Sequence, residues 1–300
     1  MISRHLLRIP DVGKPTLLHL LDRAEAFRAD RSTWPSYPRL VLGLMFFAPS
    51  TRTLLGFQSA AGRLGGTAIT STGPKYVEGM SQPETFEDTV RAVSPYCDVL
   101  VVRHPEASAL DRAASVSSVP VINAGNGTEE HPTQAIVDLF AIRRWHHRLT
   151  GLRIGIAGDL QSSRAAHSLV RALAYFDPAE LRLMYPKGYS IPSWVVGTLS
   201  LPTTECPDRL ELSGLDVLYM AGLPEGIGQT AVGDSVRAKL RLTPQSISEL
   251  PDDAVVLSPL PRIDEIDESL DGKPNCRYFE QSSDGLFVRL AILEHLLSTV

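Results

Sequence analysis

The stretch FFAPSTRTLLGFQSAAGRLGG, residues 46–66, decides the fold. It begins at the end of the apolar run LVLGLMFF, which is short enough to be a buried strand. Pro49 ends that strand, and the apolar residues between positions 54 and 64 then recur at the spacing of one helix face. The closing Gly-Gly pair is typical of a helix C-terminus. The stretch therefore predicts a strand that passes through Ser50–Thr53 into a helix.

The segment Ser50–Thr53 has the composition of an anion site. The first amides of a helix have no partner within the helix, and the positive end of the helix dipole lies behind them. Phosphate binds readily at such a position, and the guanidinium of Arg52 can contact two phosphate oxygens at once. The alternative is an ordinary N-cap, since Ser and Thr are usual capping residues. One hydroxyl is enough for a cap, so consecutive donor residues favour the anion site.

Strands and helices are predicted to alternate along the rest of the chain. In the first half, predicted strands at 67–71, 98–105 and 119–124 alternate with helices at 84–96, at 106–117 and from 131 toward 147. After residues 148–151 the pattern restarts, with strands at 152–159, 181–186, 216–220 and 254–262 and helices at 162–176, 191–200 and 285–297. This order predicts an α/β protein of two domains, each a parallel sheet covered by helices.

Three polar motifs fall where predicted strands of the first half end. They are STRT at 50–53, Arg103 in RHP, and His131 with Gln134 in HPTQ. In parallel sheets, ligands bind at the carboxyl ends of the strands. A histidine before proline is often a turn or surface residue, and a single arginine can be a surface ion-pair partner. Together, however, the three motifs predict one composite pocket.

The sequence PSTRT, followed by an amphipathic helix and LGG, resembles the carbamoyl-phosphate motif of the aspartate and ornithine carbamoyltransferases. The resemblance covers nearly the whole chain. It implies a carbamoyl-phosphate-binding domain at 1–135, joined by a C-terminal helix at 285–300, and an acceptor-binding domain at 136–284. It also implies a homotrimer. No metal or organic cofactor is expected, because carbamoyl phosphate arrives already activated.

The resemblance assigns a role to each motif. Ser50, Thr51, Arg52 and Thr53 would hold the phosphate. Thr53, Arg103 and His131 would donate to the carbamoyl oxygen, Gln134 would orient the carbamoyl nitrogen, and the backbone carbonyls of Pro259 and Leu260 would accept from the amines. Arg164 would grip a carboxylate of an amino-acid acceptor, although its position at a helix start also suits a solvated arginine. Catalytic roles are expected for Arg52, Thr53, Arg103, His131 and Gln134.

Several segments are similar to the aspartate branch of the family. They include INAGNGTEEHPTQAIVDLF, GDLQSSRAAHSLVRALAYF and YFEQSSDGLFVR. The ornithine branch has a cysteine before Leu-Pro at the position of SPLP, where this chain has Ser258-Pro259. Ornithine is therefore disfavoured as the acceptor.

Two departures concern the acceptor. Where aspartate enzymes carry an arginine and a glutamine after VLYM, this chain has Gly222 and Pro224, which offer no side-chain donor. In the loop 72–83, the family's serine and lysine, which reach a neighbouring subunit's site, correspond to about Glu78 and to Gln82. Each charge-assisted hydrogen bond contributes about 1.5–3 kcal/mol, so these losses are large.

We therefore predict transfer of the carbamoyl group to an amine that bears one carboxylate, rather than to aspartate. Two alternatives stay open. In the first, the chain is an aspartate carbamoyltransferase of pyrimidine biosynthesis, with Lys75 or Arg237 supplying the missing groups. In the second, it is a catalytically silent homologue with a structural role, against which the complete set of donor-side residues argues.

Composition limits the other functions. A length of 300 residues suggests about two domains, and the formal net charge is −5 without a basic block, so nucleic acid is not an expected partner. No segment has the ~20 consecutive apolar residues of a membrane span. Three cysteines that are far apart in sequence favour a reducing compartment, so we expect a cytoplasmic protein with no membrane contact.

Overall fold

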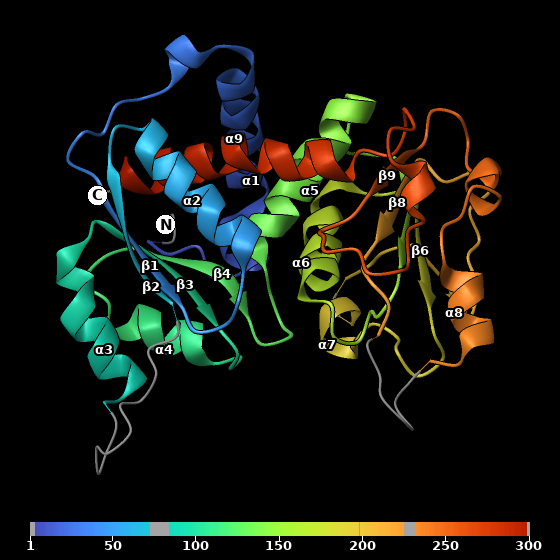
Figure 1. Cartoon of the computed structure of the whole chain (residues 1–300), viewed down its shortest axis with the longest axis horizontal. Coiled ribbons are helices and arrows are strands. Elements are labelled where there is room, and N and C mark those ends of the chain that lie inside the picture. Colours follow the sequence, from blue (N-terminus) through green and yellow to red (C-terminus); the bar gives the residue numbers. More distant parts are fainter. Residues whose placement is uncertain (1–3, 73–83, 198, 225–231, 299–300) are drawn as a thin grey trace. The chain divides into compact units, whose positions relative to one another are not determined.

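The structure is a computed structural model that describes residues 4–72, 84–197, 199–224 and 232–298. The chain divides into two compact units. Unit 1 comprises Met1–Ile136 and Asp284–Val300, and unit 2 comprises Val137–Ser283. Each unit contains one parallel sheet with helices packed against it (Figure 1). The α/β fold predicted from the sequence is therefore confirmed.

The sheet of unit 1 has four parallel strands in the order β2-β1-β3-β4. The strands are β1 (Val41–Phe46), β2 (Thr67–Thr72), β3 (Val99–His104) and β4 (Val121–Asn126). From β1 the chain moves outward in one direction to β2 and then crosses back to β3. The order of the strands therefore reverses between β1 and β3, and such a switch point is where ligands bind in open parallel sheets.

The helices of unit 1 lie on both faces of this sheet (Figure 1). They are α1 (Ile9–Ala29), α2 (Thr51–Arg63), α3 (Phe86–Val93), α4 (Ala109–Val116) and the part of α9 (Tyr278–Leu297) that follows Ser283. Apolar side chains of α3 and α4, among them Val90 and Leu110, form one buried cluster with Leu100 and Val102 of β3. The C-terminal helix returns to unit 1 as predicted, but it begins seven residues earlier than the predicted 285, at the buried Tyr278.

The sheet of unit 2 has five parallel strands in the order β7-β6-β5-β8-β9. They are β5 (Arg153–Ala157), β6 (Glu180–Tyr185), β7 (Thr203–Pro207), β8 (Val217–Met220) and β9 (Val255–Leu257). Here the order of the strands reverses between β5 and β8. The sequence did not predict β7, because this edge strand buries only Cys206 and has no apolar run.

Among the described residues, five α-helices belong wholly or partly to unit 2. They are α5 (Pro132–His146), α6 (Arg164–Leu173), α7 (Ser193–Val196), α8 (Asp234–Leu240) and the first turns of α9. Short 3₁₀ helices occupy Arg31–Thr33, Ser94–Tyr96, Ala174–Phe176, Ser246–Glu249 and Glu268–Leu270. Among the described residues, no helix combines the length and the apolar character that crossing a membrane requires. Lys75, Glu78 and Gln82 of the predicted loop lie outside the described residues.

Candidate active site

The donor half of the candidate site lies at the switch point of unit 1. β1 and β3 run parallel, and Phe46, the last residue of β1, pairs with Arg103. Ser50–Thr53 therefore follows the carboxyl end of one strand of the pair, while Arg103 stands at the carboxyl end of the other. The sequence predicted this placement, and it is the edge of a parallel sheet where ligands bind.

The N-terminus of α2 has no side-chain cap. Ser50 occupies the N-cap position in extended backbone conformation, yet no side-chain hydrogen bond caps the helix there. Thr53 is buried within the first turn, whereas Arg52 is exposed, and partial burial lowers the pKa of its guanidinium. An ordinary N-cap therefore does not explain this run of donors, and the first amides of α2 remain available to an anion.

Arg103 is held against the neighbouring strand. Its Nη1 donates a hydrogen bond of 3.0 Å to the carbonyl oxygen of Ala124 in β4. Its own carbonyl oxygen accepts from the backbone N–H of Phe47 at 2.8 Å. These bonds join the ends of β1, β3 and β4, so the guanidinium is a fixed part of the sheet edge rather than a mobile surface group.

His131 and Gln134 stand at the start of α5, after β4. His131 is buried, with 7% of its surface exposed, and its Nδ1 lies 3.2 Å from Oγ1 of Thr133. The backbone N–H of Gln134 donates to the carbonyl oxygen of His131 at 3.0 Å, which closes the first turn. Because β4 is adjacent to β3 in the sheet, the three predicted motifs lie at or after the carboxyl ends of the neighbouring strands β1, β3 and β4.

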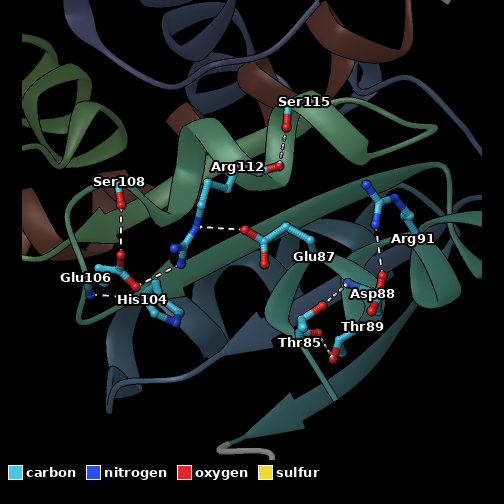
Figure 2. Close-up of polar contacts among 10 residues, drawn as sticks. All are labelled: Thr85, Glu87, Asp88, Thr89, Arg91, His104, Glu106, Ser108, Arg112 and Ser115. Carbon is cyan, nitrogen blue, oxygen red and sulfur yellow. Dashed lines mark hydrogen bonds and ion pairs between the residues drawn. The ribbon is translucent and has the colours of Figure 1, made fainter. Parts of the chain in front are cut away.

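An ion-pair network fixes the turn that follows Arg103 (Figure 2). Arg112 of α4 lies between Glu87 of α3, at 3.0 Å, and Glu106, at 2.8 Å. The backbone N–H of Glu106 donates to Nδ1 of His104 at 3.0 Å, and burial lowers the pKa of this imidazole. His104 therefore has a structural environment, joining the end of β3 to the start of α4.

The acceptor half lies at the switch point of unit 2. β5 and β8 run parallel, with Ala157 opposite Met220. Just beyond them, the backbone N–H of Asp159 donates to the carbonyl oxygen of Gly222 at 2.7 Å. The segment leading to Arg164 and the segment containing Gly222 and Pro224 are thus adjacent, as their predicted common role requires.

Arg164 is the first residue of α6. The helix is capped by Ser163, whose Oγ accepts from the backbone N–H of Ala166 at 3.3 Å. The Arg164 side chain is partly buried, and this burial lowers the pKa of its guanidinium. The Arg164 side chain is thus partly shielded from water at the start of α6, and its carboxylate-binding role stays a prediction.

The loop after β8 has a backbone suited to glycine. Gly222 has a φ of +90°, a conformation that strains an arginine side chain as well as any other L-residue. Pro224 is buried, and its carbonyl oxygen accepts from Nη1 of Arg237 at 3.0 Å. The structure therefore brings one basic side chain next to the segment that lacks donors. The guanidinium of Arg237 also forms a two-point ion pair with Asp264.

A buried hydrogen-bond network anchors the SPLP loop, and the sequence did not indicate it. The backbone N–H of Ser258 donates to Oε1 of Gln281 at 2.9 Å, and Nε2 of Gln281 donates to Oδ1 of Asp138 at 2.6 Å. Oγ of Ser258 accepts from the N–H of Leu260 at 3.1 Å. The one sequence feature that could have indicated this network is Asp138, a single carboxylate in the apolar run AIVDLFAI of α5. The network fixes the backbone at Pro259 and Leu260, whose carbonyls have the predicted binding role.

Tyr219→Phe should lower the free energy of unfolding by about 2 kcal/mol. The Tyr219 hydroxyl donates to Oδ2 of Asp138 at 2.9 Å, and both residues are fully buried. Removing the Tyr219 hydroxyl takes one hydrogen-bond donor from the Asp138 carboxylate, which water cannot reach. Urea denaturation of the purified variant measures the loss.

Tyr185→Phe is the matched control, because its hydroxyl donates to Oε2 of Glu205 at 2.6 Å but Glu205 is exposed. Water can replace that donor, so we expect a loss of at most about 0.5–1 kcal/mol. Equal losses of unfolding free energy in the two variants would show that burial of Asp138 does not strengthen its hydrogen bond with Tyr219.

Family comparisons agree with this geometry. Residues 4–144 match the model of the aspartate/ornithine carbamoyltransferase carbamoyl-P binding domain. Residues 150–296 match the model of the Asp/Orn binding domain of the same family. The chain belongs to the aspartate/ornithine carbamoyltransferase family. The two matched regions account for most of the chain, and each contains one of the two switch points.

Full-length relatives of this carbamoyltransferase carry a common name. The aspartate carbamoyltransferase catalytic subunit of Archaeoglobus fulgidus is 38% identical over 301 residues, covering 99% of this chain and all of the relative. The solved catalytic subunit of M. jannaschii aspartate transcarbamoylase superimposes with a TM-score of 0.88, at 34% identity and 99% coverage of both chains. The Trypanosoma cruzi aspartate transcarbamoylase solved with carbamoyl phosphate and aspartate gives 0.86 at 29% identity, covering 97% of this chain and 95% of that chain.

These comparisons bear on the predicted acceptor. They do not support the prediction that aspartate is not the acceptor, and they favour the alternative of an aspartate carbamoyltransferase. The prediction rested on Gly222, Pro224 and the loop 72–83. Beside Gly222 and Pro224 the structure places the side chain of Arg237, a contact that the sequence alone could not show.

Proposed function

We propose that this carbamoyltransferase transfers the carbamoyl group of carbamoyl phosphate to the amino group of L-aspartate, forming N-carbamoyl-aspartate for pyrimidine biosynthesis. The observation that carries the proposal is the placement of the donor-side residues. Ser50–Thr53 and Arg103 stand at the switch point of a parallel sheet, in a chain that resembles aspartate carbamoyltransferases from end to end. No cofactor is needed, because carbamoyl phosphate is a mixed anhydride with a good leaving group.

The phosphate group binds at the start of α2. The free amides of the first turn and the hydroxyls of Ser50 and Thr51 donate to its oxygens, and Arg52 adds a fork of N–H donors. The missing side-chain cap at Ser50 supports this role, because the ligand then supplies what a cap would. Electrostatic attraction at this end of the helix also favours a dianion.

The chemical step is attack of the amine nitrogen on the carbamoyl carbon. A C–N bond forms, the carbonyl oxygen becomes negative, and the C–O bond to phosphate then breaks as the proton of the amine passes to the leaving phosphate. Arg103, His131 and the Thr53 hydroxyl donate to that oxygen. Gln134 and the carbonyls of Pro259 and Leu260 orient the NH₂ group and the incoming amine.

Arg164 binds a carboxylate of the acceptor, because a guanidinium fork matches a carboxylate at two points. In aspartate the second carboxylate needs a further cation. Arg237 supplies it in this proposal, since it already contacts the carbonyl oxygen of Pro224 in the loop after β8. Its ion pair with Asp264 sets its orientation and competes with the ligand for its charge.

A second candidate acceptor is an amino acid with one carboxylate. The observation that favours it is the pair Gly222 and Pro224, neither of which offers a side-chain donor, with Gly222 in a backbone conformation that disfavours any larger residue. This enzyme would use the same phosphate and oxyanion groups. Only the group that binds the side chain of the acceptor would differ from that of an aspartate enzyme.

An acceptor panel separates the two candidates. Phosphate release from carbamoyl phosphate is measured with L-aspartate and with asparagine, serine, alanine and 2,3-diaminopropionate at equal concentrations. For an aspartate enzyme, we expect kcat/KM for aspartate to exceed that for the others by at least about 10²-fold, because a site built for a second carboxylate rejects analogues that lack it. Saturation with a single-carboxylate acceptor, and not with aspartate, would favour the second candidate.

Arg237→Met tests the assignment of the second cation. We expect KM for aspartate to rise by about tenfold to a hundredfold, the value of one charge-assisted hydrogen bond, while KM for carbamoyl phosphate stays unchanged. N-(phosphonacetyl)-L-aspartate, present in one solved T. cruzi relative, carries both substrate-like groups and is the binding probe. An unchanged affinity for this probe in Arg237→Met would remove Arg237 from the site.

The silent-homologue and homotrimer predictions are tested with the same material. A ligand that binds only the folded state must raise its thermal stability. If neither carbamoyl phosphate nor N-(phosphonacetyl)-L-aspartate raises the melting temperature, the proposed activity is excluded and a structural role is favoured. Mass measured by light scattering tests the homotrimer, which rests on the family resemblance.

A further inference from the structure

Arg289 of α9 is a buried cation for which the described part of the chain supplies no counter-ion. Only 6% of its surface is exposed, and its Nε has no hydrogen-bond partner. Among the described residues no carboxylate forms an ion pair with it, and the charge that acts on it is that of Arg52. Its guanidinium instead lies over the ring of Phe57 in α2, with 5.6 Å from Cζ to the ring centroid. Burying an unpaired charge is costly, so this arrangement calls for an explanation.

Two glycines make the space for this guanidinium. A Cβ atom at Gly56 of α2 would lie 2.8 Å from Cζ, Nε and Nη1 of Arg289. A Cβ atom at Gly285, one turn earlier in α9, would lie 2.4 Å from Nη1. Long side chains in a helix extend back over the preceding turn, which is why Gly285 meets the side chain of Arg289. The charge is therefore enclosed between α2 and α9.

The charged neighbour of Arg289 has the same sign. Arg52 stands one turn before Gly56 in α2, and its guanidinium acts electrostatically on that of Arg289. Burial, and after it the charge of Arg52, lower the pKa of Arg289 to about 10. At neutral pH both groups are still protonated. Two cations and the positive end of a helix dipole thus act at the start of α2.

We propose that Arg289 is a positioning residue of the carbamoyl-phosphate site, whose buried charge strengthens anion binding at the start of α2 and acts through Arg52. The dianionic phosphate group supplies the counter-ion that the described chain lacks. This inference rests on the proposed binding of carbamoyl phosphate at Ser50–Thr53. Arg289 does not touch the substrate in this role: it raises the potential at the site and repels Arg52 toward the solvent side, where Arg52 is exposed.

A structural role would look different. Arg23 of α1 also packs against α9, and its Nε and Nη2 contact Oε2 and Oε1 of Glu294 at 2.7 and 2.8 Å. That pair is a two-point bridge between helices, with both charges compensated. Arg289 has no such partner, so its removal should not cost a bridge. Replacing a buried unpaired charge with an apolar side chain of similar size often stabilises a protein.

The test is Arg289→Met, with inorganic phosphate as the probe. We expect the melting temperature without ligand to stay the same or rise, and the Kd for phosphate to increase about tenfold. KM for carbamoyl phosphate should rise by a similar factor, while KM for the amine acceptor stays unchanged. Arg289→Lys keeps the charge and should restore most of the affinity. Arg289→Gln, which removes the charge but stays polar, replaces Arg289→Met if that variant does not fold.

Arg23→Met is the matched control, since it removes a paired arginine from the same helix contact. It should lower the melting temperature and leave the Kd for phosphate unchanged. The inference is overturned if Arg289→Met binds phosphate as the wild type does, or if it behaves like Arg23→Met. If the wild type binds neither phosphate nor N-(phosphonacetyl)-L-aspartate, the proposed function itself fails, and the inference falls with it.

Discussion

Arg103→Gln should lower kcat for carbamoyl transfer by about 10²–10³-fold while the protein stays folded. Arg103 stands at the carboxyl end of β3, whose neighbour β1 leads into α2, and in the proposed mechanism its guanidinium donates to the carbamoyl oxygen that becomes negative. Glutamine keeps a polar side chain with N–H donors at this position, although it is shorter than arginine and does not reproduce the bond to the carbonyl oxygen of Ala124. The charge is lost, and with it stabilisation that is greatest in the transition state. Phosphate release at saturating substrates measures the change.

Arg112→Gln is the control for this variant. Arg112 lies in the same unit, and its ion pairs with Glu87 and Glu106 are partly exposed, so their loss should cost about 1 kcal/mol or less. Its kcat should stay within about twofold of the wild type, since it has no place in the proposed chemistry. A kcat for Arg103→Gln within tenfold of the wild type, or an equal loss in Arg112→Gln, would remove Arg103 from the oxyanion site.

The sequence predicted the elements of the fold where hydrophobic periodicity was strong. β1 and β3 are short apolar runs, and α2 has a single apolar face, so their types and positions followed directly. The strand β7 was not predicted, because Thr203, Thr204 and Glu205 are exposed at the edge of the sheet. An edge strand with one buried residue has no recognisable alternation of apolar and polar residues. The strand order within each sheet was not predicted, because periodicity says nothing of which strands are neighbours.

The placement of the predicted donor-side residues followed from the sequence for a different reason. Ser50–Thr53 and His131 follow strands, Arg103 lies near the end of one, and parallel strands place their carboxyl ends on one edge. The contacts that connect distant segments were not predictable. Arg237 meets Pro224 and Gln281 meets Asp138 only after folding. The alternative interpretation named Arg237 or Lys75 as a source of the missing groups, but the sequence could not show that Arg237 contacts Pro224, since a missing side chain at one position can be replaced by another from anywhere in the fold.

Lone charged residues within apolar helices are a sequence signal that hydrophobic periodicity does not use. Asp138 stands in AIVDLFAI and Arg289 in LFVRLAIL, and both proved to be buried. A charge in such a run is costly unless it has a partner, so its presence indicates a partner elsewhere. For Asp138 the partners are Tyr219 and Gln281. For Arg289 we infer that the ligand's phosphate group balances the charge from a distance, without direct contact.

Gly158→Ala should lower the free energy of unfolding by about 3 kcal/mol or more. Gly158 has a φ of +137°, and a Cβ atom there would lie 2.1 Å from the carbonyl oxygen of Gly222. The obstacle is backbone, which cannot rotate away as a side chain can. The loop after β8 must move, and the bond from Asp159 N–H to the Gly222 carbonyl must break. Urea denaturation measures the cost, and the affinity for N-(phosphonacetyl)-L-aspartate measures the effect on the acceptor half.

Gly188→Ala separates strain from overlap. Gly188 also has a positive φ, +93°, but a Cβ atom there meets nothing within 4 Å, so only about 1–2 kcal/mol of backbone strain is expected. The excess cost in Gly158→Ala is then the overlap with Gly222. Inorganic phosphate should still bind Gly158→Ala, because its proposed site lies in unit 1, whereas the aspartate-bearing probe should bind more weakly. If Gly158→Ala binds that probe as the wild type does, the contact between the segments after β5 and β8 has no part in holding the acceptor.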